Sequence, residues 1–267
     1  ETANPFLAHH VIQGHAVLPI IHASTWMAQS VAAFYPGFYL QKAEKVKLFK
    51  GIVFDGHKKD EYVLTLKELE KDDARIRVQA NITSDAGLKL PVQHYQAVIT
   101  LAAQPAAAPK ESLPDIQHIR PVLPDASVVY SDGTLFHGTD FQGVRQVLEL
   151  TESGTLLLCE HPGISPERQG QFPVRQINAF LTDVMYQGLL IWVRRFKGCA
   201  CLPLRTEWVD IYAPLPFGHP FYVSLQVVQS DDFAMEADIT AFDPATGNIY
   251  MKSHRAGVTL SRDLKWE

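Results

Sequence analysis

The chain has 267 residues, of which 46% are hydrophobic and 20% are charged, and its formal net charge is −5. This composition is ordinary for a globular protein that can bury a sizeable core. No apolar stretch reaches the length needed to span a bilayer, so we expect no membrane insertion. The basic residues are scattered along an acidic chain, which argues against nucleic acid as a partner.

The cysteines are Cys159, Cys199 and Cys201, an odd number without a CxxC pair. This usage predicts free thiols and a cytoplasmic location. Cys199 and Cys201 lack a second cysteine pair, so we predict no metal site. The chain begins at Glu1 and shows no signal segment, which we interpret as a piece of a longer polypeptide.

The first long element is an apolar run over residues 20–35, which Pro36 and Gly37 end. It is apolar on nearly every face, so it predicts a helix that other elements must wrap. Four strand-like segments separated by turn signals follow it, at residues 46–54, 61–69, 75–83 and 92–102. We therefore expect four antiparallel strands around one buried helix.

A second apolar helix is predicted over residues 176–196, ending in basic residues and Gly198. Four more strand-like segments follow it, at residues 205–213, 221–230, 234–243 and 248–260. The order of elements in the first half is therefore repeated, which indicates two equivalent halves.

The two halves are separated by a change of composition. Residues 104–124 are rich in proline and alanine, as a semi-rigid connector is. We place the first half at residues 1–103 and the second at residues 125–267. An active site between equivalent halves could draw one residue from each.

His10 lies four positions before Gly14, and Gly14 lies five before Pro19. A glycine lets backbone approach a ligand, and proline suits the first turn of a helix. A neutral imidazole beside a helix N-terminus suits a general base with a stabilising dipole nearby. The alternative is an ordinary partly buried histidine, and the neighbouring His9, His15 and His22 keep that alternative open.

Asp183 is predicted on the second helix among apolar residues, with Gln187 one turn further along the same face. Burial would raise the pKa of the carboxyl group and favour the protonated form that a general acid needs. Gln187 could orient it through its amide. The alternative is a structural acid on a buried helix.

The spacing from His10 to Pro19, the segment 135–142 and the segment 183–187 together resemble the dehydratase domains of polyketide synthases and polyunsaturated fatty acid synthases. The resemblance covers essentially the whole chain. It implies an α+β double hot dog fold, in which two antiparallel sheets are each wrapped around a long buried helix.

The resemblance also assigns residues. It implies that His10 is the catalytic histidine, that Asp183 is the catalytic aspartate and that Gln187 supports the aspartate. Gly14 and Pro19 would bring backbone N–H groups and the helix dipole to the thioester. The implied substrate channel comprises Phe136, His137, Gly138, Phe141, Leu202 and Pro203. Many relatives carry tyrosine-glycine where this chain has His137-Gly138 after Phe136, so a tyrosine hydroxyl sometimes found at the site entrance is missing.

The implied activity is the elimination of water from a 3-hydroxyacyl thioester to give a 2-enoyl thioester. The acyl chain would arrive on the phosphopantetheine of an acyl carrier protein, with no metal or redox cofactor. The expected partners are that carrier protein and the other domains of a multidomain fatty acid or polyketide synthase, with a homodimer left open. Arg194, Arg195, Lys197 and Arg205 form one candidate landing area for the carrier.

Other activities of the same fold are kept as alternatives. The same pair of residues could move a double bond as an enoyl isomerase, or direct cyclisation as a product-template domain does. A non-catalytic domain that binds acyl chains is the third alternative.

Overall fold

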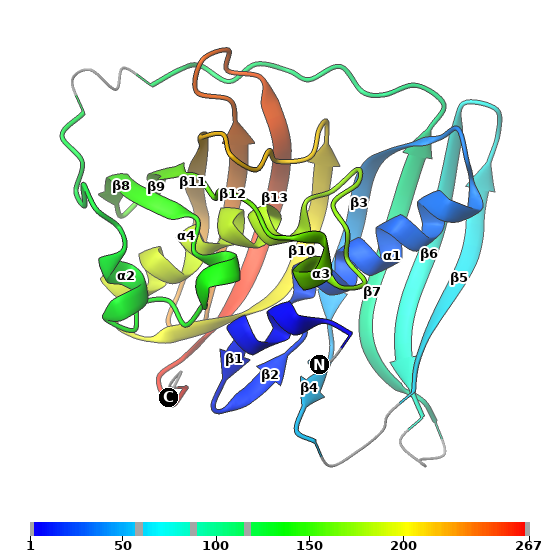
Figure 1. The fold of residues 1–267 in the computed structure, drawn as a ribbon, viewed down its shortest axis with the longest axis horizontal. Coiled ribbons are helices and arrows are strands. Elements are labelled where there is room, and N and C mark those ends of the chain that lie inside the picture. Colours follow the sequence, from blue (N-terminus) through cyan, green and yellow to red (C-terminus); the bar gives the residue numbers. More distant parts are fainter. Residues whose placement is uncertain (1–2, 57–60, 86–89, 115–118, 265–267) are drawn as a thin grey trace.

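The computed structural model describes residues 3–56, 61–85, 90–114 and 119–264. Two long helices, α1 (Ile20–Phe34) and α4 (Ala179–Lys197), are each packed against strands of one large antiparallel sheet (Figure 1). The strands of the first half are β3 (Tyr39–Leu48), β5 (Tyr62–Lys71), β6 (Arg75–Ser84) and β7 (Val92–Ala102). Those of the second half are β8 (Val144–Thr151), β9 (Gly154–Cys159), β10 (Ala200–Ile211), β11 (Phe221–Ser230), β12 (Ala234–Phe242) and β13 (Ile249–Ser261).

The two halves repeat one pairing scheme. In each, the first strand after the helix pairs with the last strand, and the strand order is β3-β7-β6-β5 in the first half and β10-β13-β12-β11 in the second. β3 and β10 pair antiparallel, so the two sheets that we expected join into one ten-stranded sheet. The double hot dog prediction is confirmed, although the sequence patterns missed β8 and β9, which extend the second half beyond β11.

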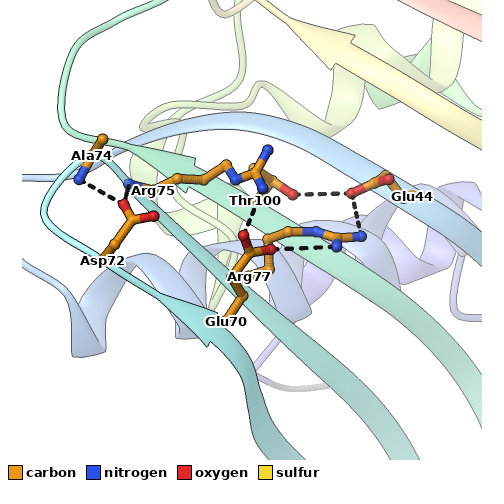
Figure 2. Close-up of polar contacts among 7 residues, drawn as sticks. All are labelled: Glu44, Glu70, Asp72, Ala74, Arg75, Arg77 and Thr100. Atoms are coloured by element: carbon orange, nitrogen blue, oxygen red, sulfur yellow. Dashed lines mark hydrogen bonds and ion pairs between the residues drawn. The ribbon is translucent and has the colours of Figure 1, made fainter.

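Burial alternates along the strands because successive side chains point to opposite faces. In β6, Ile76, Val78, Ala80 and Ile82 face the core. On the opposite face, Arg77 bridges Glu44 of β3, at 3.2 Å, and Glu70 of β5, at 3.5 Å (Figure 2). Such solvent-facing ion pairs add little stability, so the buried face determines the register.

The buried helix α4 begins three residues later than predicted. The side chain of Asn178 accepts a hydrogen bond from the N–H of Leu181 at 3.2 Å and so caps the helix. Gly198 ends it in the left-handed conformation, with φ of 63°. Among the described residues, no helix is both long and apolar enough to cross a membrane.

A small sheet of β1 (Val11–Ile12), β2 (His15–Val17) and β4 (Val53–Phe54) lies beside the 3-10 helix η1 (Pro5–His9). Gln13 and Gly14 form the two-residue turn between β1 and β2, with φ values of 51° and 78°. Positive φ at both positions is typical of a type I′ hairpin turn, which explains the glycine.

The remaining short helices are α2 (Val128–Ser131), α3 (Pro166–Gln169) and the 3-10 helix η2 (Thr139–Phe141). The connector after β7 contacts the second half, because Lys110 forms an isolated bridge with Asn248 and Leu123 forms one with Val147. The boundaries 1–103, 104–124 and 125–267 stay predictions.

Candidate active site

His10 is held by the β1–β2 hairpin. Its Nδ1 lies 2.8 Å from the carbonyl oxygen of Val17, and the N–H of Val17 donates to the carbonyl of His10 at 3.0 Å. Because a carbonyl can only accept, Nδ1 carries the proton and Nε2 keeps its lone pair. Burial lowers the pKa of His10 to about 4, although the Asp183 carboxylate opposes this shift. The His10 imidazole is therefore neutral near pH 7.

Asp183 comes from the opposite half of the chain and meets His10 in the interior. Asp183 lies on α4. One of its carboxyl oxygens, one ring nitrogen of His10 and one ring nitrogen of His137 all lie within 4.8 Å of one another. All three side chains are buried. The double hot dog thus brings together the two residues that the sequence paired from opposite halves.

The protonation state expected for Asp183 is not the one that this environment favours. Burial by itself raises the pKa of the Asp183 carboxyl group, but the His137, His10 and His22 imidazoles more than offset that effect. The pKa lies below its ordinary value, so the expectation of a raised pKa was wrong. The reason is that burial was considered without the imidazoles that the fold places around the carboxyl group.

His137 is the closest of those imidazoles. Its Nε2 lies 3.3 Å from Oδ1 of Asp183, and Phe136 stacks on its ring with 4.1 Å between the ring centroids. The His10 ring makes edge contacts with Phe136 and His137, at 4.9 and 5.4 Å between centroids. We expected His137 only as a channel residue, whereas the structure places it in contact with the carboxyl group.

The hydrogen bonds of the Gln187 amide go to residues other than Asp183, which we had expected it to orient. Its Nε2 donates to the carbonyl of Phe141 at 2.8 Å, and its Oε1 accepts from the hydroxyl of Tyr130 at 2.8 Å. The loop that carries His137 continues into η2, which packs against α4, and the side-chain amide of Gln187 hydrogen-bonds to this segment. Gln187 therefore anchors the segment that follows His137, and its support of Asp183 stays a prediction.

A cavity of about 430 Å³ opens beside these groups and has a mainly apolar lining. Of the predicted channel residues, Phe136, His137, Leu202 and Pro203 line it. Pro19, at the start of α1, lines it as well.

Three other predicted site residues lie outside this lining. Gly138 packs against His9, and Phe141 is fully buried in the core behind His10. Gly14 is exposed in the hairpin turn, where its conformation, rather than a ligand, accounts for it. Gly138 and Phe141 therefore pack behind the cavity wall, whereas Gly14 shapes only the turn.

His22 of α1 is a buried neighbour that the sequence did not single out. Its ring stacks on Phe6 at 4.5 Å, and among the described residues neither ring nitrogen has a hydrogen-bond partner. Burial lowers its pKa to about 3. It is a neutral, apolar-like wall behind Asp183 at neutral pH. The sequence signal that could have identified His22 is its position about one turn after Pro19, at the start of the same helix.

Histidine and aspartate side chains also bind divalent cations, and the cluster of His10, His137 and Asp183 has the necessary spacing. A cation held there would occupy ring-nitrogen lone pairs of the two histidines, so the same cluster cannot bind a cation and leave those nitrogens free to accept a proton.

No protein-family model matches the chain. A curated relative, a polyunsaturated fatty acid synthase subunit from Thraustochytrium sp., is 31% identical over 251 residues, which are 93% of this chain and 9% of the relative. The chain thus spans about a tenth of the length of that relative.

Solved dehydratase domains share the fold. A trans-AT polyketide synthase dehydratase domain from Brevibacillus brevis matches with a TM-score of 0.76 at 16% identity, over 98% of this chain and 92% of that one. The dehydratase domain from the CurH module of curacin polyketide synthase matches with a TM-score of 0.69 at 19% identity, over 97% of this chain and 88% of that one. A trans-acyltransferase polyketide synthase enoyl-isomerase matches with a TM-score of 0.68 at 13% identity, over 96% of this chain and 95% of that one. These matches confirm the resemblance to such domains and the double hot dog fold.

Proposed function

We propose that this chain is a dehydratase domain that eliminates water from a 3-hydroxyacyl thioester delivered by an acyl carrier protein. The observation that carries the proposal is the convergence of His10 and Asp183, from opposite halves, within 4.8 Å at one apolar cavity. An elimination needs a base at the carbon next to the thioester and an acid at the hydroxyl group. Two groups at that separation can serve one substrate from both sides.

In this scheme, the neutral His10 takes the proton from C2 on Nε2. The electron pair of the C2–H bond forms the C2–C3 double bond, and the C3–O bond breaks. A proton from the side of Asp183 converts the departing hydroxyl group to water. The first-turn N–H groups of α1 have no partner within the helix and lie at the cavity wall beyond Pro19, which supports a role in stabilising the thioester oxygen.

The lining of the cavity suits an acyl chain. Leu190, Leu202 and Val258 contribute apolar surface, and a smaller apolar cavity between α1 and β10 shares Ile20, Leu189 and other lining residues with it. An acyl chain would gain about 25 cal/mol for each Å² of apolar surface removed from water.

The carrier protein, the other synthase domains and the absence of a required cofactor all belong to the proposal. The last turn of α4 carries Arg194, Arg195 and Lys197, which suit an acidic carrier surface. Arg205 is less available than the sequence implied, because it pairs with the buried Glu236 at 2.5 Å.

Double-bond migration is the second candidate, since a solved enoyl-isomerase has the same fold. Migration requires a base that removes a proton and returns it, whereas loss of water also requires an acid at the hydroxyl oxygen. The presence of Asp183 opposite His10 favours elimination.

The test is to incubate the protein with a 3-hydroxyacyl thioester and, separately, with a 2-enoyl thioester, and to identify the products. We expect loss or addition of water without double-bond migration. His10→Ala and Asp183→Asn should lower the rate by about 10²- to 10⁴-fold or more. His219→Ala and Asp232→Asn, both at exposed positions, are the matched controls. Near-normal dehydration in both site variants, with the fold intact, would refute the assignment.

A further inference from the structure

The proposed elimination needs a group that can donate a proton to the departing hydroxyl oxygen. The lowered pKa of Asp183 makes it a carboxylate at neutral pH, and a carboxylate cannot protonate a hydroxyl group. His10 cannot supply the proton either, because it must begin the reaction without one.

His137 is the group best placed to supply it. Its Nε2 is 3.3 Å from Oδ1 of Asp183, which is an ion-pair distance rather than that of a well-aligned hydrogen bond. His137 is 5% exposed and Asp183 is 7% exposed, so both side chains are largely withdrawn from bulk water. Both side chains line the same cavity as His10, so a substrate there reaches all three.

We propose that His137 and Asp183 hold one proton between them, and that this pair rather than Asp183 alone is the acid of the elimination. The inference rests on the proposed function and assigns His137 a catalytic role.

The protons balance over one turnover. Before reaction, His10 is neutral, and His137 and Asp183 form an imidazolium and a carboxylate, or the equivalent neutral imidazole and carboxylic acid. The elimination moves one proton from C2 to His10 and one from the pair to the leaving oxygen, which departs as water. The site then holds an imidazolium at His10, a neutral His137 and a carboxylate at Asp183. A proton passed from His10 through water to the pair restores the starting state.

The surroundings isolate this proton. The titratable side chains that line the cavity with the pair are His10, His15, Tyr95, Tyr186 and Cys201, and His22 of α1 lies behind Asp183. Burial keeps His22 neutral, and the hydroxyl group of Tyr186 donates to Ser253 at 2.8 Å. Asp140, further along the same loop, pairs with Arg168 at 2.7 Å. Among the described residues, His137 is therefore the one imidazole in ion-pair contact with Asp183.

The pH dependence of His137→Gln tests the pair. Glutamine keeps an N–H donor near Asp183 but cannot carry the transferable proton. We expect a loss of about 10²-fold or more in kcat at pH 8, a smaller loss at pH 6, and an alkaline limb displaced to lower pH. The displacement is expected because the variant leaves the Asp183 carboxyl group as the one member of the pair that can hold the proton, and the pKa of that group is lowered.

His254→Gln is the matched control. His254 forms another histidine–aspartate pair, with Asp210 at 3.2 Å, but it does not line the cavity. The pH dependence of kcat in this control should run parallel to that of the wild type. If the pH dependence of kcat in His137→Gln is also parallel to that of the wild type, whatever the size of kcat, the inference is overturned while the proposed function stands. A wild-type protein without dehydratase activity would instead refute the proposed function.

A second measurement does not depend on turnover. Nitrogen NMR of ¹⁵N-labelled imidazoles reports how many protons His137 carries at each pH. We expect His137 to lose its second N–H at a lower pH in Asp183→Asn than in the wild type, because the variant removes the carboxylate that stabilises the imidazolium. An unchanged titration of His137 would overturn the shared proton.

Discussion

The backbone N–H of Gly138 donates a hydrogen bond to the carbonyl of His9 at 2.8 Å. His9 precedes His10, and Gly138 follows His137, so this bond joins the segments that carry two imidazoles of the site. The segments come from opposite halves of the chain. Their relative position therefore depends on a contact one residue away from the proposed chemistry.

Gly138→Ala should disturb this contact. A Cβ atom at Gly138 would lie 2.8 Å from Cβ and 2.9 Å from Cα of His9, which is too close without a backbone movement. We expect a loss of about 1–3 kcal/mol in the free energy of unfolding, together with a reduced kcat. Gly188→Ala is the control, because its nearest contacts are at 3.4–3.5 Å and alanine favours the helix. Denaturant unfolding and thioester dehydration measure both effects, and equal behaviour of the two variants would contradict the prediction.

The same junction is reinforced by Asp140. Its carboxylate is 4% exposed, pairs with Arg168 at 2.7 Å and lies 3.1 Å from Nδ1 of His9. Arg168→Met leaves a buried carboxylate without its guanidinium, so we expect a loss of stability of about 1–3 kcal/mol and a lower kcat with little change in KM. Arg262→Met, at an exposed position, should change neither. A fall in stability with an unaltered kcat would show that the ion pair does not position His10.

His22→Phe should stabilise the protein. The imidazole lies among Phe6, Phe141 and Phe180, and its nitrogens have no partner among the described residues. Replacing an unpaired buried polar group by a ring of similar shape removes a desolvation cost of about 1–3 kcal/mol. We expect a higher melting temperature with dehydration retained. A destabilised variant would indicate that the imidazole has a partner, such as a buried water.

The stability of His22→Phe should also respond less to acid. In the wild type, the folded pKa of His22 is about 3, and the unfolded value is the ordinary one of about 6.5. Between these two pH values the unfolded chain binds a proton at His22 that the folded chain excludes. The contribution of the neutral His22 to the free energy of unfolding is therefore fully present above about pH 6.5. It falls by about 1.4 kcal/mol for each pH unit as the pH drops toward the folded pKa. The free energy of unfolding, measured at intervals from pH 7 to pH 4, should change less with pH in the variant than in the wild type. Parallel pH dependences would contradict the assignment.

The activity of the wild type should persist in mild acid. Because the pKa of His10 is about 4, protonation inactivates the base only near that pH and not near 6.5. We expect the acid limb of kcat/KM to have its inflection below pH 5, with circular dichroism used to exclude unfolding at each point. An inflection near pH 6.5 would mean that the base is a solvated imidazole.

Much of the fold could be predicted from the sequence. The two apolar helices, the strands that follow each of them and the repeated order of elements all follow from hydrophobic periodicity and turn residues, which are local properties. β8 and β9 were missed because they precede the second helix and have no counterpart in the first half's pattern. The pairing of β3 with β10 is a contact between distant segments and leaves no local signal.

For the site, the sequence by itself determined the residue types: a histidine before a glycine and a proline, and an aspartate on an apolar helix. Only the tertiary structure decided their environment. It placed His137 against Asp183, directed Gln187 to Phe141 and surrounded the carboxyl group with imidazoles, so that its pKa falls where burial alone would raise it. The physical reason is that a pKa depends on charges and hydrogen bonds within a few ångströms. In this fold those neighbours come from the segment after η1, from α1 and from the loop before β8, rather than from the residues next to Asp183 in sequence.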